Sequence, residues 1–305
     1  MDFSLKAYHN LTREFNWIDL INSIDSDKYT FIDSNNDNYI FAWGSEDQLI
    51  QTTFHSNLLL DFETKYSNQY LFGYLGYDAK TDFYKSEESN NPDFHHLPES
   101  IFYVPEHVVL KKNNNLMYFG TETGFKHFKS LQINAYKPAK SISSLKLICN
   151  TNFREYKKNI EKIHDHLQQG NIYEMNYCIN FTSTHSDLNI IESYKKLKQN
   201  TKAPFSTLFK FNNTVVLSAS PERFFTKRHK TILSQPIKGT APRDSDPAID
   251  KQIQKDLLNN QKEISENIMI VDLVRNDLSR IADKKTVSVP ELCKLYSFET
   301  VHQLI

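Results

Sequence analysis

Cysteine and glycine are scarce in this chain of 305 residues. Its three cysteines, Cys149, Cys178 and Cys293, are odd in number, lie far apart and form no CxxC pair. This spacing argues against a disulfide framework and against structural zinc, and it predicts a protein of the reducing cytoplasm. The seven glycines form neither a GxGxxG nor a GxxxxGKS/T motif, which argues against a nucleotide-phosphate loop.

Excess charge and long apolar runs are missing too. Lysine and arginine number 36 against 37 aspartates and glutamates, for a formal net charge of -1, so no global charge favours nucleic acid or an anionic membrane as partner. The N-terminal residues lack the basic-then-apolar pattern of a secretory signal, and no apolar run approaches the length of a membrane span. Hydrophobic residues at 39% and aromatic residues at 13% predict a globular protein with a substantial core, as one large domain or two ordinary ones.

Asparagine clusters divide the first half of the chain at residues 33–38, 88–93 and 111–116. Between them lie short segments rich in aromatic and β-branched residues, namely YIFAW, YLFGYLGY and IFYVPEHVVL. Such segments, separated by turn residues, predict short strands in an antiparallel sheet.

The second half mixes helical and strand patterns. Asn152 and Glu155 form a plausible capping box for a helix that ends at Gly170. Strict alternation over residues 171–183 predicts a strand, and residues 214–225 and 231–240 are interpreted as two further strands that end in turns. A helical pattern then covers residues 247–282, with a possible break at Asn259–Asn260, and its IMIVDLV run should be buried on most sides. Strands and helices without strict βαβ order predict an α+β architecture.

Three features suggest chemistry, although each also has an ordinary structural explanation. Glu222 follows a strand at a turn, where glutamates are mostly surface residues or ion-pair partners. Glu263 and Glu266 share one helix face, which suits a hard cation such as Mg²⁺ but is more often simply solvated. Lys238, between an apolar run and a Gly-Thr turn, is either a solvated strand-end lysine or a nucleophile.

Five blocks connect these residues: GNIYEMNY (170–177), SASPERF (218–224), PIKGTAPR (236–243), KEISENIMIVDLVRNDLSR (262–280) and FETVHQL (298–304). In this order they resemble the chorismate-utilising enzymes, which include the large components of anthranilate and aminodeoxychorismate synthases and the isochorismate and salicylate synthases. YLFGYLGYDAK in the first half resembles the amino-terminal portion of the first two members.

The resemblance implies an α/β sandwich of two subdomains with mainly antiparallel sheets and an active site in the cleft between them. It divides the chain into an amino-terminal region, 1–145, and a chorismate-binding region, 146–305. Because members of the family continue past the last block, it also implies that the chain lacks its C-terminal part.

Lys238 carries the implied specificity. Anthranilate synthases usually have PIAGT at this stretch, whereas aminodeoxychorismate synthases have PIKGT, whose lysine is held to attack chorismate. The resemblance is therefore closest to aminodeoxychorismate synthase component I, a Mg²⁺-dependent enzyme that makes 4-amino-4-deoxychorismate for the folate branch. Ammonia would come from a separate glutamine amidotransferase subunit, since no glutamine-hydrolysing domain is visible.

The other site residues are also implied by the resemblance. Glu222 matches the general acid, whose pKa burial would have to raise. Glu266 matches a Mg²⁺ ligand and Glu263 a nearby carboxylate that can act through water, while Gly239 and Thr240 match a turn that touches substrate.

Glu174 is expected to contact substrate. It stands where isochorismate and salicylate synthases carry a lysine and where the aminating members commonly carry glutamine, so it opposes isochorismate formation. The alternatives left open are anthranilate synthase component I and a catalytically inert, truncated relative.

Overall fold

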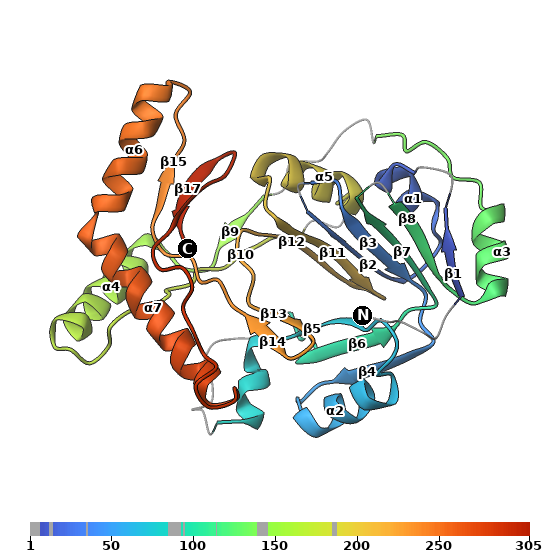
Figure 1. Ribbon diagram of the computed structural model, residues 1–305, viewed down its shortest axis with the longest axis horizontal. Helices are drawn as coiled ribbons and strands as arrows, with labels where there is room; N and C mark the ends of the chain where they lie inside the picture. The colour runs from blue at the N-terminus through green and yellow to red at the C-terminus, as the bar shows by residue number, and fades with distance from the viewer. Residues whose placement is uncertain are drawn as a thin grey trace. The chain divides into compact units, whose positions relative to one another are not determined.

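The computed structural model describes residues 7–11, 15–34, 36–84, 93, 95–113, 115–138, 146–184 and 188–305. They form two compact units, one of residues 1–136 with 194–305 and one of residues 137–193. Helices and antiparallel strands are mixed along the chain, which confirms the predicted α+β class (Figure 1).

The helices of the described residues are α1 (Trp17–Ser23), α2 (Ser56–Lys65), η1 (Tyr77–Asp82), α3 (Glu122–Ser130), α4 (Phe153–Gln168), α5 (Ile190–Thr201), α6 (Pro247–Asn259) and α7 (Gln261–Ser279). None of these is both long enough and apolar enough to cross a membrane.

The largest sheet has the order β1-β8-β7-β3-β2-β11-β12, and a second has the order β4-β6-β5; every neighbouring pair is antiparallel. Their strands are β1 (Ala7–Asn10), β2 (Lys28–Asp33), β3 (Tyr39–Trp43), β4 (Asp47–Gln51), β5 (Phe72–Leu75), β6 (Ser100–Val104), β7 (His107–Lys112), β8 (Asn115–Gly120), β11 (Phe205–Phe211) and β12 (Thr214–Ser220). The three apolar segments of the first half therefore supply β3, β5, β6 and β7, as predicted.

The remaining strands form three small antiparallel sheets, β9-β10, β13-β14 and β15-β17-β16. Their bounds are β9 (Ile148–Cys149), β10 (Phe181–Thr182), β13 (Thr226–Arg228), β14 (Thr231–Leu233), β15 (Thr240–Pro242), β16 (Leu295–Ser297) and β17 (Val301–Leu304).

The seven-stranded sheet is covered on both faces, which places the main core of the larger unit. On one face Phe31 stacks on Trp17 of α1 and meets Tyr194 of α5 edge-on. On the other face Phe209 and Tyr103 belong to a buried cluster that joins this sheet to β4-β6-β5. Alternate residues of each strand thus enter different layers, as the two-residue period of a strand requires.

Strand β11 pairs with β2 through a register that sets Leu208 opposite Phe31. The predicted amino-terminal region, 1–145, and chorismate-binding region, 146–305, therefore share one sheet, and the compact units divide the chain elsewhere. The subdomain division itself remains a prediction.

Several local predictions are confirmed. Asn152 caps α4 by accepting from the Glu155 amide at 3.0 Å, and Gly170 ends that helix at a φ of +72°. The break predicted at Asn259–Asn260 is the junction of α6 and α7, where the Asn260 side chain caps the second helix. The asparagine clusters at 33–38 and 111–116 lie at the β2-β3 and β7-β8 hairpin turns. Asn35, Asn114 and most of the cluster at 88–93 lie outside the described residues.

Two local predictions are wrong. Of the strand predicted over 171–183, only Phe181–Thr182 forms a ladder, because its partner β9 offers two residues and strand pairing needs a partner as well as alternation. The IMIVDLV run is not buried on most sides, since Ile268 and Leu273 are about half exposed in the described chain. The described neighbours of α7 cover the face that carries Asn267, and the apolar residues extend beyond that face.

Candidate active site

The PIKGT residues form a turn between β14 and β15, held by β17. The Lys238 amide donates to the Leu304 carbonyl at 3.3 Å, and the Leu304 amide donates to the Gly239 carbonyl at 3.0 Å. Lys238 is half-buried and Gly239 is buried. Gly239 has a φ of +85°, in the left-handed region where glycine is strain-free. The backbone conformation at Lys238 is thus fixed by hydrogen bonds to Leu304 and by the left-handed conformation of Gly239.

We expect Gly239→Ala to impair this turn more than backbone strain alone would. A Cβ at position 239 would lie 3.1 Å from Leu304 Cδ1 and 3.2 Å from Glu263 Cβ. Gly170 has a similar φ of +72° but no atom within 4 Å of a built Cβ, so Gly170→Ala is the matched control. We expect Gly239→Ala to lower the rate of product formation about tenfold and Gly170→Ala to leave it within about twofold. Equal rates for the two variants would contradict a tightly packed turn.

Glu222 lies beside the same turn. It follows β12, and the Ser220 hydroxyl shapes the connection by donating to the Glu222 carbonyl at 2.7 Å. Glu222 Oε1 then accepts from the Ile237 amide at 3.0 Å, one residue before Lys238. Two of the five sequence blocks therefore meet here. Glu222 is exposed in the described chain, so the burial expected for a general acid is not present among these residues.

Glu263 and Glu266 approach the turn from α7. Asn260 Oδ1 accepts from the Glu263 amide at 3.3 Å, which begins the helix. Side-chain exposures of 23% for Glu263 and 36% for Glu266 leave both carboxylates within reach of solvent. Lys262 Nζ lies 3.6 Å from Glu263 Oε1 and 3.2 Å from Glu266 Oε1. Glu266 first, and Glu263 with it, raise the pKa of Lys262, so the two carboxylates share one cation.

This pair can contribute to a magnesium site but is not a complete protein cage. Among the described residues no group of three or more His, Cys, Asp or Glu side chains is arranged to hold a metal. Magnesium is usually bound by one or two protein carboxylates and completes its shell with water and substrate oxygens. Two partly exposed carboxylates that already share the ammonium of Lys262 fit that mode of binding.

Thr240 begins β15 opposite Gln303 of β17, and Gln303 Nε2 donates to Thr240 Oγ1 at 3.4 Å. Glu174 lies in the separate unit of residues 137–193. The fold thus brings Glu222 and the α7 carboxylates next to the PIKGT turn. The substrate-binding role of Glu174 remains a prediction.

A buried polar network that the sequence analysis missed supports the strands next to the turn. His302 is fully buried, with Nε2 2.9 Å from Asp250 Oδ1 and Nδ1 2.8 Å from Ser297 Oγ. Arg243 binds both oxygens of Asp250, at 2.9 and 3.0 Å, and donates to the Phe298 carbonyl. This network fastens α6 to the β15-β17-β16 sheet, and Figure 1 shows that helix beside β15 and β17. An ion pair between a buried aspartate, Asp250, and an exposed arginine, Arg243, leaves no periodic signal in a sequence.

We expect Asp250→Asn to lower the melting temperature by more than about 5 °C at pH 7, because Arg243 would lose its carboxylate partner. Arg243 holds the pKa of Asp250 well below its ordinary value. A depressed carboxyl pKa stabilises the fold above the unfolded-state pKa of about 4, and that stabilisation is lost as the pH falls toward the folded-state pKa. The difference in melting temperature should therefore shrink between pH 7 and about pH 3.

Asp256→Asn is the matched control, because Asp256 is exposed on the same helix. Thermal melts at three pH values check the prediction. It is contradicted if both variants melt alike, or if the difference for Asp250→Asn is independent of pH.

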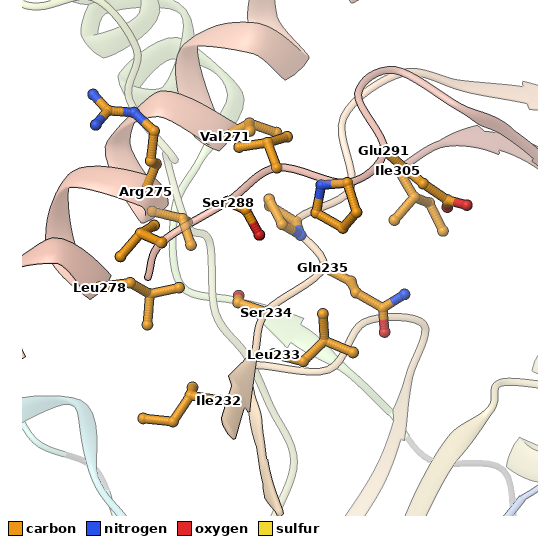
Figure 2. A pocket seen from close by; sticks show the side chains of 15 residues that line it. Ile232, Leu233, Ser234, Gln235, Val271, Arg275, Leu278, Ser288, Glu291 and Ile305 are labelled. Atoms are coloured by element: carbon orange, nitrogen blue, oxygen red, sulfur yellow. The ribbon is translucent and has the colours of Figure 1, made fainter. Parts of the chain in front are cut away.

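Figure 2 shows a separate pocket of about 320 Å³ between β14 with the residues after it, one face of α7 and the segment 287–291. Its lining is mainly apolar, and Arg275 at its edge pairs with Asp272 at 2.7 Å. Lys238, Glu222 and the two α7 glutamates do not line it. Of the turn only Pro236 borders this pocket, so the four predicted side chains lie outside it.

Comparison with known proteins gives relatives by sequence. The chain is 39% identical over 156 residues to aminodeoxychorismate synthase component 1 of Klebsiella aerogenes, which is 51% of this chain and 34% of that protein. It is 31% identical over 240 residues to an anthranilate synthase component I-like protein of Synechocystis, which is 76% of this chain and 49% of that protein. The matches thus span between a third and a half of these relatives.

Comparison of structures confirms the fold. Anthranilate synthase component I from Streptococcus pneumoniae superposes with a TM-score of 0.70 at 17% identity, over 99% of this chain and 72% of the other. The menaquinone-specific isochorismate synthase of Escherichia coli gives a TM-score of 0.66 at 14% identity, over 98% and 69%. The predicted α+β fold, an α/β sandwich with mainly antiparallel sheets, is therefore shown.

A family profile described as chorismate binding enzyme matches residues 19–305. This match covers strands β2 to β8 of the first half as well as all five sequence blocks, but not β1, and it agrees with the relatives found by sequence and by structure. The resemblance inferred from the blocks is confirmed: the chain belongs to the chorismate-binding enzyme family.

Proposed function

We propose that the protein is the chorismate-aminating component of an aminodeoxychorismate synthase, converting chorismate and ammonia to 4-amino-4-deoxychorismate for folate biosynthesis. The identity of 36–39% to three bacterial proteins of that name supports the proposal. The observation that carries it is the position of Lys238: Glu222 is hydrogen-bonded to the residue before it, and Glu263 packs against the residue after it.

The proposed reaction uses the uncharged amine of Lys238 as a nucleophile. The amine forms a bond to ring carbon 2 while the ring double bonds shift and the hydroxyl at carbon 4 departs. Glu222 donates the proton that lets this hydroxyl leave as water, a role that requires bound substrate to bury its carboxyl, which is exposed in the described chain. Ammonia then bonds to carbon 4, the double bonds shift back, and the lysine amine leaves carbon 2. Glu222 then takes a proton from the new ammonium group, which regenerates the enzyme and leaves the amino group at position 4.

Glu263 and Glu266 would hold Mg²⁺ in this proposal, with Gly239 and Thr240 against the substrate. A bound magnesium ion would hold the ring carboxylate and polarise the allylic system. The turn and the helix would then have separate roles. The turn presents the amine of Lys238, and the metal held by α7 orients the substrate ring by binding the ring's carboxylate.

Product identity tests the proposal. The complete protein is incubated with chorismate, Mg²⁺ and ammonium, and a lyase that releases 4-aminobenzoate is added. We expect 4-aminobenzoate to appear only when the lyase is present. Appearance of anthranilate would assign the protein to the anthranilate branch, which the Synechocystis relative represents. Absence of any product would favour an inert relative.

Ammonia in this proposal comes from a separate glutamine amidotransferase, which agrees with the name "component 1" of the relatives. We expect glutamine to support the reaction only when that subunit is added, and copurification of the two to check the pairing. We place the reaction in the cytoplasm, because all three cysteines are free thiols, as in reducing compartments.

A further inference from the structure

The most deeply buried side chain of α7 is polar. Asn267, directly after the proposed ligand Glu266, is 1% exposed, while apolar neighbours such as Ile268 and Leu273 are about half exposed. Burying an amide costs free energy unless its hydrogen bonds are made inside the protein. A buried amide at this place therefore needs a structural explanation.

The amide of Asn267 is bonded to three other segments. Its Nδ2 donates to the Leu304 carbonyl at 3.1 Å and makes a longer contact of 3.5 Å to the Lys238 carbonyl. Its Oδ1 accepts from Cys293 Sγ at 3.4 Å. The Leu304 carbonyl also accepts from the Lys238 amide at 3.3 Å. The helix, the turn and the end of β17 thus meet at one side chain.

This arrangement links the turn that carries Lys238 to the helix that carries the two glutamates. Lys238 stands on the turn, whereas Glu263 and Glu266 stand on α7 within one turn of Asn267. A leucine at position 267 would bury more apolar surface but could not bond the two carbonyls. The amide therefore defines where the helix sits against the turn, and so how far the amine lies from the carboxylates.

We propose that Asn267 is a positioning residue that sets the distance between Lys238 and the carboxylates of α7. This inference rests on the proposed function. Asn267 acts through the backbone of Lys238 and through its own helix, without touching the ring. Displacement of a reacting group by about 1 Å can lower a rate on the order of 100-fold, so loss of the amide should affect turnover more than binding.

The variants are Asn267→Ala, which removes the amide, and Asn267→Asp, which keeps the shape but turns a donor into an acceptor facing two carbonyls. The matched control is Gln51→Ala in β4. Gln51 is also a buried amide, 4% exposed, donating to Ser100 Oγ at 3.0 Å and accepting from the His55 amide at 2.9 Å. Each variant is made in the complete protein and assayed at the same interval below its own melting temperature.

We expect both Asn267 variants to lower kcat by about 10- to 100-fold with KM for chorismate within about threefold, and Gln51→Ala to keep kcat within about twofold. Hydrogen exchange should become faster at residues 236–243 in the Asn267 variants and stay as in the wild type in Gln51→Ala. The proposal is overturned if Asn267→Ala keeps kcat within about threefold, or if Gln51→Ala loses as much.

Hydrogen exchange also separates this inference from the proposed function. If the wild type yields no 4-amino-4-deoxychorismate, the proposed function fails, but exchange at 236–243 still decides whether Asn267 holds the turn. Faster exchange confined to 236–243 and 301–305 in Asn267→Ala would support the positioning role. Unchanged exchange at both segments would overturn it.

Discussion

Lys238→Ala is expected to abolish formation of 4-amino-4-deoxychorismate, with a loss on the order of 10³-fold or more. The turn itself should survive, because it is held by backbone hydrogen bonds to Leu304 and by the conformation of Gly239. Without the amine no bond forms between lysine and ring carbon 2, so any residual product reports direct attack by ammonia on the ring. Chromatography of the products, with anthranilate as a standard, would show whether amination moves to carbon 2.

Lys238→Arg distinguishes a nucleophile from a positive charge. Arginine stays protonated and cannot attack the ring, but it supplies the same charge at the turn. We expect it to be as inactive as Lys238→Ala, while Lys227→Ala, at an exposed position on β13, keeps full activity. In the wild type without ammonia, intact-mass measurement should detect a chorismate-derived adduct on Lys238. Activity near the wild-type level in Lys238→Arg would refute covalent catalysis.

The positions of the proposed site residues were predictable from the sequence because they lie in short blocks with a local turn or strand-end pattern. PIKGT predicted a turn with Lys238, and SASPERF predicted Glu222 at a strand end; both lie where these patterns indicate. The starts of α4 and α7 were also predictable, because Asn152 and Asn260 cap these helices through hydrogen bonds to residues two or three positions later.

Features that depend on distant segments were not predictable in this way. The alternation of residues 171–183 satisfied the local condition for a strand, but the ladder needed a partner, and β9 pairs with only Phe181–Thr182. Asn267 and the Asp250–His302 contact join segments 26 to 52 residues apart. For Asn267 one signal was available: it stands four residues after Glu263, on the same helix face. A polar residue there marked the contact with the turn.

The carboxylate pair of α7 should produce the second large effect. We expect Glu266→Gln to raise the Mg²⁺ concentration needed for half-maximal rate by about 100-fold or more, because a neutral amide oxygen is a far weaker ligand for a hard cation. Glu263→Gln should raise it by about tenfold, since that carboxylate is proposed to act through water. Calorimetric titration of Mg²⁺ provides a measurement that does not depend on turnover.

Lys262 offers a control with the opposite sign. Its ammonium lies 3.2 Å from Glu266 Oε1 and 3.6 Å from Glu263 Oε1, so it competes with a metal for the same oxygens. Because exposed ion pairs are weak, Lys262→Ala should lower the required Mg²⁺ concentration by only about two- to fivefold. Lys255→Ala, exposed on α6, should change nothing. If both Glu266→Gln and Glu263→Gln bind Mg²⁺ like the wild type, the ion must be held elsewhere. The proposal that α7 binds the metal while the turn supplies the nucleophile would then be wrong.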